Sequence, residues 1–250
     1  MKENRLIEME RYIREKRSVS LDTLCEVFKV SKNTVRRDVA QLVRTTDIQK
    51  IYGGVSVQFN RIPPSFNERA DVNLPSKQRI GRYAASLVQD GDVIFIDAGT
   101  TTCQMVNFMA EKKNVTIITH SLDVITRAFA FPNLNVIVIS GKLNRKTYSF
   151  TNQYKFALQD YNISKAFMAC TGFTIENGAT QAISDEFAIK KCAALKSDRV
   201  ILMAENQKIG TVCFLTYAKA SRFSTIITDK EPNERFSKAF TDLGGEIIVP

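Results

Sequence analysis

Seven short apolar runs recur at regular intervals through the last two-thirds of the chain. They read "VIFID", "VTIIT", "NVIVIS", "KAFMACT", "RVILMA", "STIIT" and "EIIV". Segments with apolar residues at helical spacing, such as "KQRIGRYAASLV" and "DEFAIKKCAALKS", lie between most of them. Buried strands that alternate with helices are typical of an α/β domain with a largely parallel sheet. The alternation therefore predicts an α/β domain over residues 77–250.

Polar residues follow the first run in "FIDAGTTT", where a strand would turn into a helix. In parallel sheets, ligands bind at the carboxyl ends of the strands. Gly99 allows the backbone to approach a ligand closely. Thr100, Thr101 and Thr102 offer hydroxyl and N–H groups at a helix N-terminus, where the helix dipole favours an anion. Asp97 would repel a phosphate and suits a sugar hydroxyl better. Taken alone, the motif also fits a capped turn that binds no ligand.

The ends of the later runs add further candidate ligand contacts. Lys208 follows "RVILMA" and is a point charge for a phosphate or a carboxylate. The basic pair in "NRKTYSF" can close over an anion. We therefore expect an effector site at one edge of the sheet, and its additional residues are His120, Ser121, Gly141, Arg145, Lys146, Gly172 and Lys208.

The first 60 residues have a different pattern. Three successive segments, "RLIEMERYIRE", "SVSLDTLCEVF" and "KVSKNTVRRDVAQLV", carry apolar residues at helical spacing, and Ser20 and Ser31 are suitable N-caps for the second and third. "IQKIYGGVSVQF" then alternates around Gly53-Gly54, a two-residue hairpin signal. Three helices followed by a hairpin predict a winged helix-turn-helix, which is a DNA-binding element order.

The polar face of the third segment carries the side chains that such a domain uses on DNA. Asn and Gln read adenine and Arg reads guanine, while Lys and Arg also bind phosphate. Residues 1–60 hold 12 Lys and Arg against 8 Asp and Glu, an excess that favours a nucleic-acid partner. An ordinary solvated helix face is the alternative. The expected DNA contacts are Ser31, Lys32, Asn33, Thr34, Arg36, Arg37, Gln41 and Arg44, with Lys50 and Tyr52 in the hairpin.

A stretch without periodicity, "NRIPPSFNERADVNLPSKQ", separates the two patterns and contains Pro63, Pro64 and Pro75. This composition predicts an extended linker, although Phe66 would favour burial in a packed loop. We therefore expect a DNA-binding domain at residues 1–58, a linker at 59–76 and an effector domain at 77–250.

Both domains resemble those of one known family. "VSLDTLCEVFKVSKNTVRRDVAQL…IQKIYGGV" is similar to the N-terminal signature of the DeoR family of bacterial sugar-catabolism repressors, and "D-x-GTTT", "T-x-S" and the "K-x-G" of "NQKIG" resemble its effector domain. The resemblance implies an effector domain similar in fold to ribose-5-phosphate isomerase and the coenzyme A transferases. His120 stands where the family commonly has Asn. The phosphate contacts that the resemblance implies are Gly99, Thr100, Thr101 and Lys208, with Asp97 and Ser121 nearby.

Within the family, "VSKNTVRRD", "FIDAGTTT", "RKTYSF" and "YNISKAFM…TG" look most like the repressors of myo-inositol catabolism. That resemblance implies a phosphorylated sugar acid of the pathway, 2-deoxy-5-keto-gluconate 6-phosphate, as effector. We expect a homo-oligomer, a dimer or tetramer, because one three-helix head makes too few contacts for tight specific binding to double-stranded operator DNA. Activation in place of repression stays open, because the sign depends on operator position.

The alternative function is a phosphosugar isomerase or a coenzyme A transferase-like enzyme with an appended DNA-binding head. An isomerase needs a base supported by further acids, yet "SKAFMACTGFTIENG" offers only Glu176. A transferase needs a nucleophilic glutamate, and Glu186 and Glu205 are the only ones nearby, in no matching motif. We therefore expect no catalytic residues.

Composition narrows the class further. One histidine and five scattered cysteines give no metal-ligand spacing, so we expect neither a metal nor a cofactor. The apolar runs are too short for a membrane span. The charged N-terminus lacks the apolar core of a signal peptide, which predicts a cytoplasmic protein.

Overall fold

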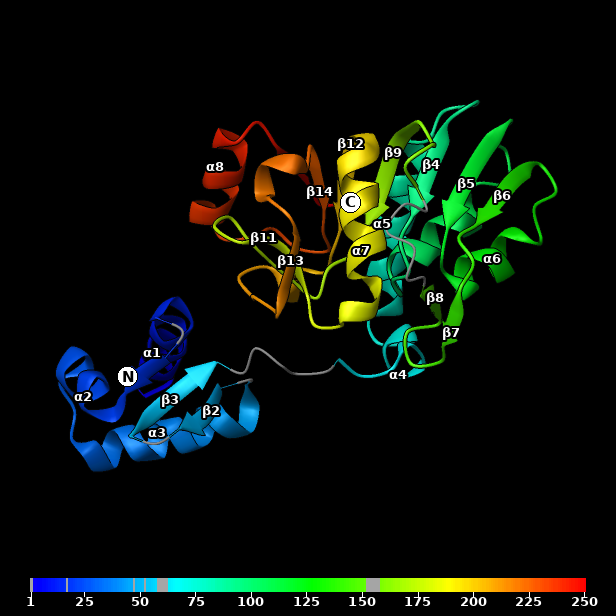
Figure 1. The fold of residues 1–250 in the computed structure, drawn as a ribbon. Coiled ribbons are helices and arrows are strands. Elements are labelled where there is room, and N and C mark those ends of the chain that lie inside the picture. The colour runs from blue at the N-terminus through cyan, green and yellow to red at the C-terminus, as the bar shows by residue number, and fades with distance from the viewer. Residues whose placement is uncertain (1, 17, 47, 52, 58–62, 152–157) are drawn as a thin grey trace. The chain divides into compact units, whose positions relative to one another are not determined.

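The computed structural model describes residues 2–16, 18–46, 48–51, 53–57, 63–151 and 158–250. The chain forms two compact units, residues 1–61 and residues 62–250 (Figure 1). Among the described residues, no helix is both long and apolar enough to cross a membrane. The two units are described one at a time below.

Unit 1 contains the predicted helices and hairpin. The elements are α1 (Lys2–Lys16), α2 (Leu21–Phe28), α3 (Lys32–Thr45), β2 (Ile48–Ile51) and β3 (Gly54–Val57). The apolar residues at helical spacing form its core, among them Met9, Ile13, Leu24, Val35 and Val39, each at most 1% exposed. Ser20 and Ser31 cap α2 and α3 as predicted, since their side chains accept hydrogen bonds from the N–H groups three residues later. The predicted winged helix-turn-helix, three helices followed by a hairpin, is thus confirmed.

Two details of unit 1 differ from the sequence prediction. A short third strand, β1 (Ser18–Ser20), pairs with β3, and the sheet order is β1-β3-β2. The hairpin turn also lies one residue earlier than predicted, because Ile51 pairs with Gly54. A Cβ atom on Gly54 would come within 2.3 Å of the Val19 carbonyl oxygen, so this glycine serves the close approach of β1 and not the turn.

Unit 2 is built on a parallel sheet of seven strands in the order β15-β14-β12-β9-β4-β5-β6. Every neighbouring pair in this sheet is parallel. The predicted α/β class is therefore confirmed, and each of the seven apolar runs supplies one strand: β4 (Val93–Ile96), β5 (Val115–Thr119), β6 (Leu134–Val138), β9 (Ile163–Met168), β12 (Ser197–Met203), β14 (Thr225–Ile227) and β15 (Glu246–Ile248).

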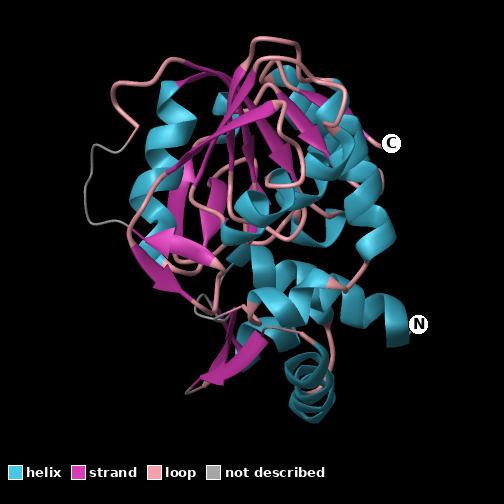
Figure 2. Ribbon diagram, turned by 90° about the vertical axis from the view of Figure 1, so that its right-hand side faces the viewer, coloured by secondary structure: helices cyan, strands magenta, loops and turns pink. Residues whose placement is uncertain are grey.

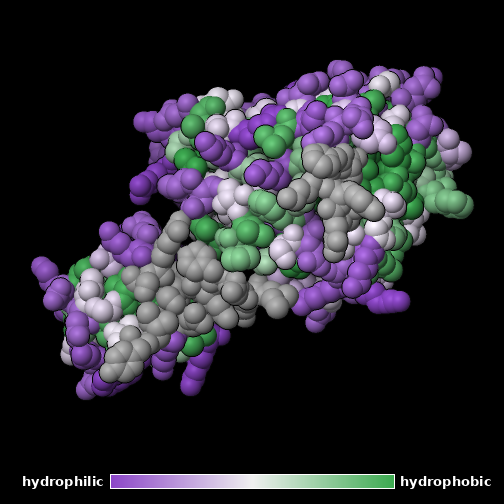
Figure 3. Space-filling view, viewed as in Figure 1, coloured by the Kyte–Doolittle hydropathy of each residue, from purple (hydrophilic) through white to green (hydrophobic). Residues whose placement is uncertain are grey.

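Helices cover both faces of this sheet (Figure 2). Successive strand residues point to opposite faces, so Ile94 and Ile96 pack in one core cluster while Phe95 packs in the other. Each fully buried apolar side chain contributes about 1.5–3 kcal/mol. Hydrophilic side chains cover much of the visible surface of each unit (Figure 3). The core cluster that contains Ile94 and Ile96 lies under α5 (Leu74–Ser86), the 3-10 helix η1 (Thr102–Phe108) and α6 (Leu122–Ala128). The cluster that contains Phe95 lies under α7 (Phe187–Lys196) and α8 (Glu234–Asp242).

Smaller elements stand at the edge of unit 2 where the ligand was expected. One antiparallel sheet is formed by β10 (Gly172–Thr174), β11 (Gly178–Gln181) and β13 (Leu215–Ala218), and a hairpin by β7 (Lys142–Asn144) and β8 (Ser149–Thr151). The described residues of the unit also form three further turns of 3-10 helix: η2 (Ser184–Glu186), η3 (Asn206–Lys208) and η4 (Ala220–Arg222).

The prediction of an extended linker over residues 59–76 is wrong for its second half. Residues 66–70 form a helix, α4 (Phe66–Ala70), and α5 already begins at Leu74. Ser65 and Glu68 form a capping box at the start of α4. Phe66 is 3% exposed and stacks on Tyr148, with ring centroids 5.1 Å apart. Burial of this aromatic ring draws the segment into the α/β unit, which is the packed alternative that Phe66 favours.

Candidate functional site

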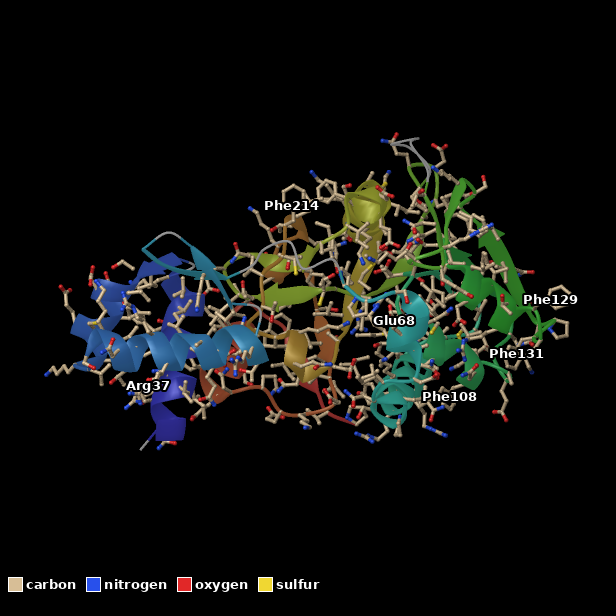
Figure 4. The ribbon with its side chains drawn as sticks, turned by 90° about the horizontal axis from the view of Figure 1, so that it is seen from below. Arg37, Glu68, Phe108, Phe129, Phe131 and Phe214 are labelled. Carbon is tan, nitrogen blue, oxygen red and sulfur yellow. The ribbon has the colours of Figure 1, made fainter. Side chains whose placement is uncertain are left out.

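Helix α3 presents the predicted DNA-contacting side chains on its outer surface. Val35, Val39 and Leu42 face the core, and the other side of the helix is solvent-exposed. Arg37, labelled in Figure 4, belongs to this exposed side. The exposed positions among the predicted contacts are Ser31, Lys32, Asn33, Arg36, Arg37, Gln41, Arg44 and Lys50, while Thr34 is half-buried. Tyr52 lies outside the described residues.

Ion pairs hold α3 in place. Arg5 Nε donates to Asp38 Oδ2 at 2.7 Å, which ties α1 to α3 through a carboxylate that is only 1% exposed. Lys32 Nζ lies 2.6 Å from Asp22 Oδ1 on α2. The aspartate of "TVRRD", Asp38, therefore has a structural role, which the sequence analysis did not assign. Arg36 and Arg37, by contrast, form no ion pair within the described chain and point their charge at solvent.

A pocket lies in unit 2 at the carboxyl ends of β4, β9 and β12. The pocket is lined by four of the predicted residues, Gly99, Thr100, Thr101 and Lys208. It therefore brings together the residues that follow the first and the fifth apolar runs. Its other walls come from α4, from the turn of the β7–β8 hairpin and from the start of α7. The remaining lining residues are Pro63, Arg69, Ala98, Thr147, Ala169, Cys170, Thr171, Gln181, Ile183, Glu186 and Lys190.

The "DAGTTT" turn is held by hydrogen bonds within itself. Gly99 N–H donates to Thr102 Oγ1 at 3.0 Å, and Thr102 Oγ1 donates to the Asp97 carbonyl oxygen at 2.6 Å. Thr102 is thus a structural residue and opens the expected helix, which is the 3-10 helix η1. A Cβ atom on Gly99 would lie 2.7 Å from Ala169 Cβ, so only glycine fits between β4 and β9.

Donors in this turn remain available to a ligand. Thr101 is buried, and its Oγ1 has no hydrogen-bond partner among the residues that the structure describes. The backbone N–H groups of Thr100 and Thr101 donate to no described acceptor either. Because buried polar groups are normally hydrogen-bonded, these groups are suited to contact a polar ligand.

Three cationic side chains face the same pocket. Lys190 Nζ lies 2.6 Å from Asp97 Oδ2, so Asp97 neutralises it. Arg69 and Lys208 form no ion pair with any described carboxylate. Burial lowers the pKa of both Arg69 and Lys208. A bound anion would relieve this cost, so the pocket is electrostatically suited to a phosphate or a carboxylate.

Asp97 does not occupy the place expected of a sugar contact. It is fully buried, its Oδ1 accepts from Ala98 N–H, and its Oδ2 accepts from Ala169 N–H and Lys190. Although burial alone would raise the pKa of Asp97, the charge of Lys190 and the hydrogen bonds from Lys190 and Ala169 N–H lower it overall. Asp97 is therefore an internal acceptor that positions Lys190.

His120 lies behind the pocket in a fully buried position. Its ring stacks on Phe95 with centroids 5.8 Å apart, and its Nε2 lies 3.8 Å from Asp97 Oδ1. Neither ring nitrogen has a hydrogen-bond partner among the described residues. Burial lowers the pKa of His120 in spite of the nearby carboxylates Asp97 and Glu186. The imidazole is thus held in its neutral form.

The other expected residues do not line the pocket. Ser121 caps α6 by accepting from Val124 N–H at 3.2 Å. A Cβ atom on Gly172 would lie 2.3 Å from the Thr211 carbonyl oxygen, so Gly172 serves packing in β10. Gly141, Arg145 and Lys146 are exposed. Of the segment "NRKTYSF", Thr147 lines the pocket, whereas the charged side chains of Arg145 and Lys146 do not.

Sequence reasoning missed several pocket residues. Arg69 was hidden in the supposed linker, and Lys190 lies within a helix, four residues after Glu186. Glu186 Oε1 accepts from Ser149 Oγ at 2.6 Å, and Ser149 Oγ lies 2.6 Å from Thr147 Oγ1. Gln181 Oε1 is buried without a partner among the described residues. The pocket thus has uncharged and acidic lining residues as well as cations, and the Glu186 carboxylate attracts Arg69.

The two units match two domain families. Residues 5–60 match the DeoR-like helix-turn-helix domain, and residues 72–230 match the DeoR C terminal sensor domain, which is more than half of the chain. The chain belongs to the DeoR family. This DeoR-family protein is a transcriptional regulator and not an enzyme, so the alternative of an isomerase or transferase with a DNA-binding head is not retained.

Individual relatives agree with this assignment. The DeoR-family chain is 42% identical over 240 residues to the HTH-type transcriptional regulator IolR of Bacillus subtilis (strain 168), covering 95% of each chain. It is 26% identical over 249 residues to the HTH-type transcriptional repressor GlcR of the same strain, covering 99% of this chain and 96% of the other.

Solved structures give more distant likenesses. A D-ribose-5-phosphate isomerase in complex with phospho-erythronic acid is 13% identical with a TM-score of 0.40, covering 53% of this chain and 52% of that one. A 4-hydroxybutyrate CoA-transferase from Porphyromonas gingivalis is 13% identical with a TM-score of 0.43, covering 68% and 52%. Similarity at this level is too low to bear on the function of the pocket.

Proposed function

We propose that the chain is the repressor of a myo-inositol catabolic operon and that a phosphorylated sugar acid releases it from its operator. The 42% identity to IolR supports the pathway, together with the motifs that resemble repressors of myo-inositol catabolism. The proposed effector is 2-deoxy-5-keto-gluconate 6-phosphate.

One observation carries the effector chemistry. Arg69 and Lys208 face a pocket without carboxylate partners, beside the unbonded N–H groups of Thr100 and Thr101. Backbone N–H groups and cations that converge in this way bind phosphate oxygens through charge-assisted hydrogen bonds. The phosphate of the effector is therefore assigned to this side of the pocket.

The uncharged and acidic lining residues of the pocket suit the rest of such a molecule. Glu186 accepts hydrogen bonds from hydroxyl groups, and the side chains of Gln181 and Thr147 both donate and accept them. A compound with a phosphate at one end and several hydroxyl or keto oxygens at the other matches both groups of lining residues. An apolar or cationic ligand would leave the two free cations unpaired.

DNA binding is assigned to α3 and the hairpin of unit 1. Helix α3 would enter the major groove, with Arg36, Arg37 and Gln41 at base edges and phosphates. A homo-oligomer, dimer or tetramer, would place two such helices on two half-sites. An effector that prefers a conformation with wrongly spaced heads then weakens operator binding by its differential affinity for the two states.

Fluorescence anisotropy of labelled DNA from upstream of the chain's own operon tests this proposal. The protein is titrated at fixed salt, because affinity for DNA depends on salt, with and without a panel of sugar phosphates. We expect 2-deoxy-5-keto-gluconate 6-phosphate to release the DNA. Without this compound, the protein should lower transcription from the same promoter. Release by none of the compounds, or higher transcription with protein alone, would contradict the proposal.

A further inference from the structure

Helix α4, on which Figure 4 labels Glu68, is at once a wall of the pocket and the first helix after the DNA-binding unit. Only residues 58–65 separate it in sequence from β3. Pro63 and Arg69 both line the pocket, so the chain touches the ligand-binding space as soon as it enters unit 2. None of the sequence motifs assigned a ligand contact to this segment.

Helix α4 is held by the packing of Phe66 in the core and by hydrogen bonds at both of its ends. Phe66 N–H donates to the Lys146 carbonyl oxygen at 2.8 Å, and Phe66 stacks on Tyr148 in the β7–β8 turn. At the other end, the buried ammonium of Lys77 donates to the Arg69 carbonyl oxygen. A five-residue helix has no stability of its own. The position of α4 therefore depends on these tertiary contacts.

Arg69 is the charged contact of α4 with the pocket. Its Nε donates to the Pro64 carbonyl oxygen at 2.9 Å, within the same segment. The guanidinium forms no ion pair with a described carboxylate, and burial lowers its pKa. The Glu186 carboxylate attracts the guanidinium without forming an ion pair, so the cost of burying this charge is only partly offset and weakens the packing of α4. An anion in the pocket would reverse that effect.

We propose that Arg69 is an anion-contacting residue of the effector site and that, through it, α4 packs more tightly in the liganded state and transmits occupancy to the segment leading to the DNA-binding unit. This inference rests on the proposed function, since it concerns the same site. The ligand chemistry is a phosphate or similar oxyanion shared between Arg69, Lys208 and the Thr100–Thr101 N–H groups. Removing the guanidinium should therefore separate effector binding from the effector response.

Hydrogen exchange of the full chain gives the first test. Amide exchange of peptides covering residues 63–74 is measured by mass spectrometry with and without 2-deoxy-5-keto-gluconate 6-phosphate, and with inorganic phosphate as a minimal anion. Slower exchange over these residues with either anion is expected. Unchanged exchange there, with bound compound verified by calorimetry, would overturn the assignment of α4.

The Arg69→Gln variant gives the second test, with Arg79→Gln on α5 as a matched control because Arg79 is exposed and does not line the pocket. Loss of one charge-assisted contact should weaken binding of the sugar acid phosphate by at least about tenfold. At saturation the variant should also release far less operator DNA than the wild type, while Arg79→Gln behaves as wild type.

The outcomes are distinguishable. Full release of DNA by Arg69→Gln at saturation would overturn this inference and leave the proposed function standing. No binding of any phosphorylated compound to the wild type would overturn the proposed function and the inference together. Circular dichroism checks that Arg69→Gln is folded; if it is not, Arg69→Lys keeps the charge without the planar fork and should show an intermediate loss of response.

Discussion

Lys190 Nζ lies 2.6 Å from Asp97 Oδ2, and both side chains are buried beneath the pocket. The pair joins the end of β4 to α7, and Ala169 N–H at the end of β9 binds the same oxygen at 2.9 Å. Asp97 therefore fixes the three elements that shape the site. Arg69 and Lys208, which form no ion pair with a described carboxylate, then make the pocket suitable for an anion.

Asp97→Asn should destabilise the fold strongly. The substitution leaves Lys190 buried without a counter-charge, which costs about 3–5 kcal/mol. Asp123→Asn is the control, because its partner Arg127 is part-exposed and that ion pair contributes about 0–1 kcal/mol. Urea unfolding of both variants measures the difference. Equal losses would contradict the buried role of the Asp97–Lys190 pair.

Stability should fall at mildly acidic pH because of His120. The pKa of His120 in the folded state lies below its ordinary value of 6.5, so the unfolded chain binds the proton first. Unfolding is therefore favoured as the pH falls below about 6.5, by up to about 1.4 kcal/mol per pH unit. His120→Asn removes this contribution, and because it is the single histidine, the comparison is clean. Parallel pH dependences of wild type and variant between pH 7.5 and 5.5 would refute this.

Thr101→Val should affect the effector and not the fold. The Thr101 hydroxyl is buried and unpartnered among the described residues, so its removal should leave stability unchanged or slightly higher. Binding of the phosphorylated effector should weaken by about 1 kcal/mol, roughly fivefold. Thr228→Val is the matched control, because the Thr228 hydroxyl is equally buried and unpartnered but does not line the pocket. A normal effector response in Thr101→Val would mean that the turn binds no ligand.

Arg36→Ala and Arg37→Ala should weaken operator binding and leave effector binding intact. Loss of a base contact costs about 1–3 kcal/mol and relaxes specificity at one position, whereas loss of a phosphate contact lowers the salt slope by about 1. Arg11→Ala, an exposed residue of α1, controls for the change in net charge. Wild-type operator affinity in both α3 variants would sink the recognition-helix assignment.

The parts of the fold that sequence predicted are those set by local periodicity. All seven apolar runs became strands of the parallel sheet, and the apolar residues at helical spacing in the three N-terminal segments form the core of unit 1. β1 escaped prediction because a three-residue strand has no measurable period and is defined only by its pairing with β3. Phe66 was the one local sign that the supposed linker would pack.

The site was predictable only where a residue directly follows a strand. Gly99 and Thr101 were found in this way. Arg69 and Lys190 were not, because they reach the pocket from helices, and Lys190 is placed by a hydrogen bond to Asp97 across 93 residues of sequence. The sequence analysis assigned Asp97 to the ligand. The residues next to Asp97 in sequence do not reveal that N–H groups and the Lys190 ammonium donate hydrogen bonds to its carboxylate.

The proposed mechanism requires that the anion site and the DNA-binding unit are energetically linked. The most direct test is calorimetric titration of 2-deoxy-5-keto-gluconate 6-phosphate into the free protein and into the protein saturated with operator DNA. Linkage is reciprocal, so the compound should bind the DNA complex more weakly by the same factor by which it weakens DNA binding. Equal affinities for the free protein and the complex would contradict the account.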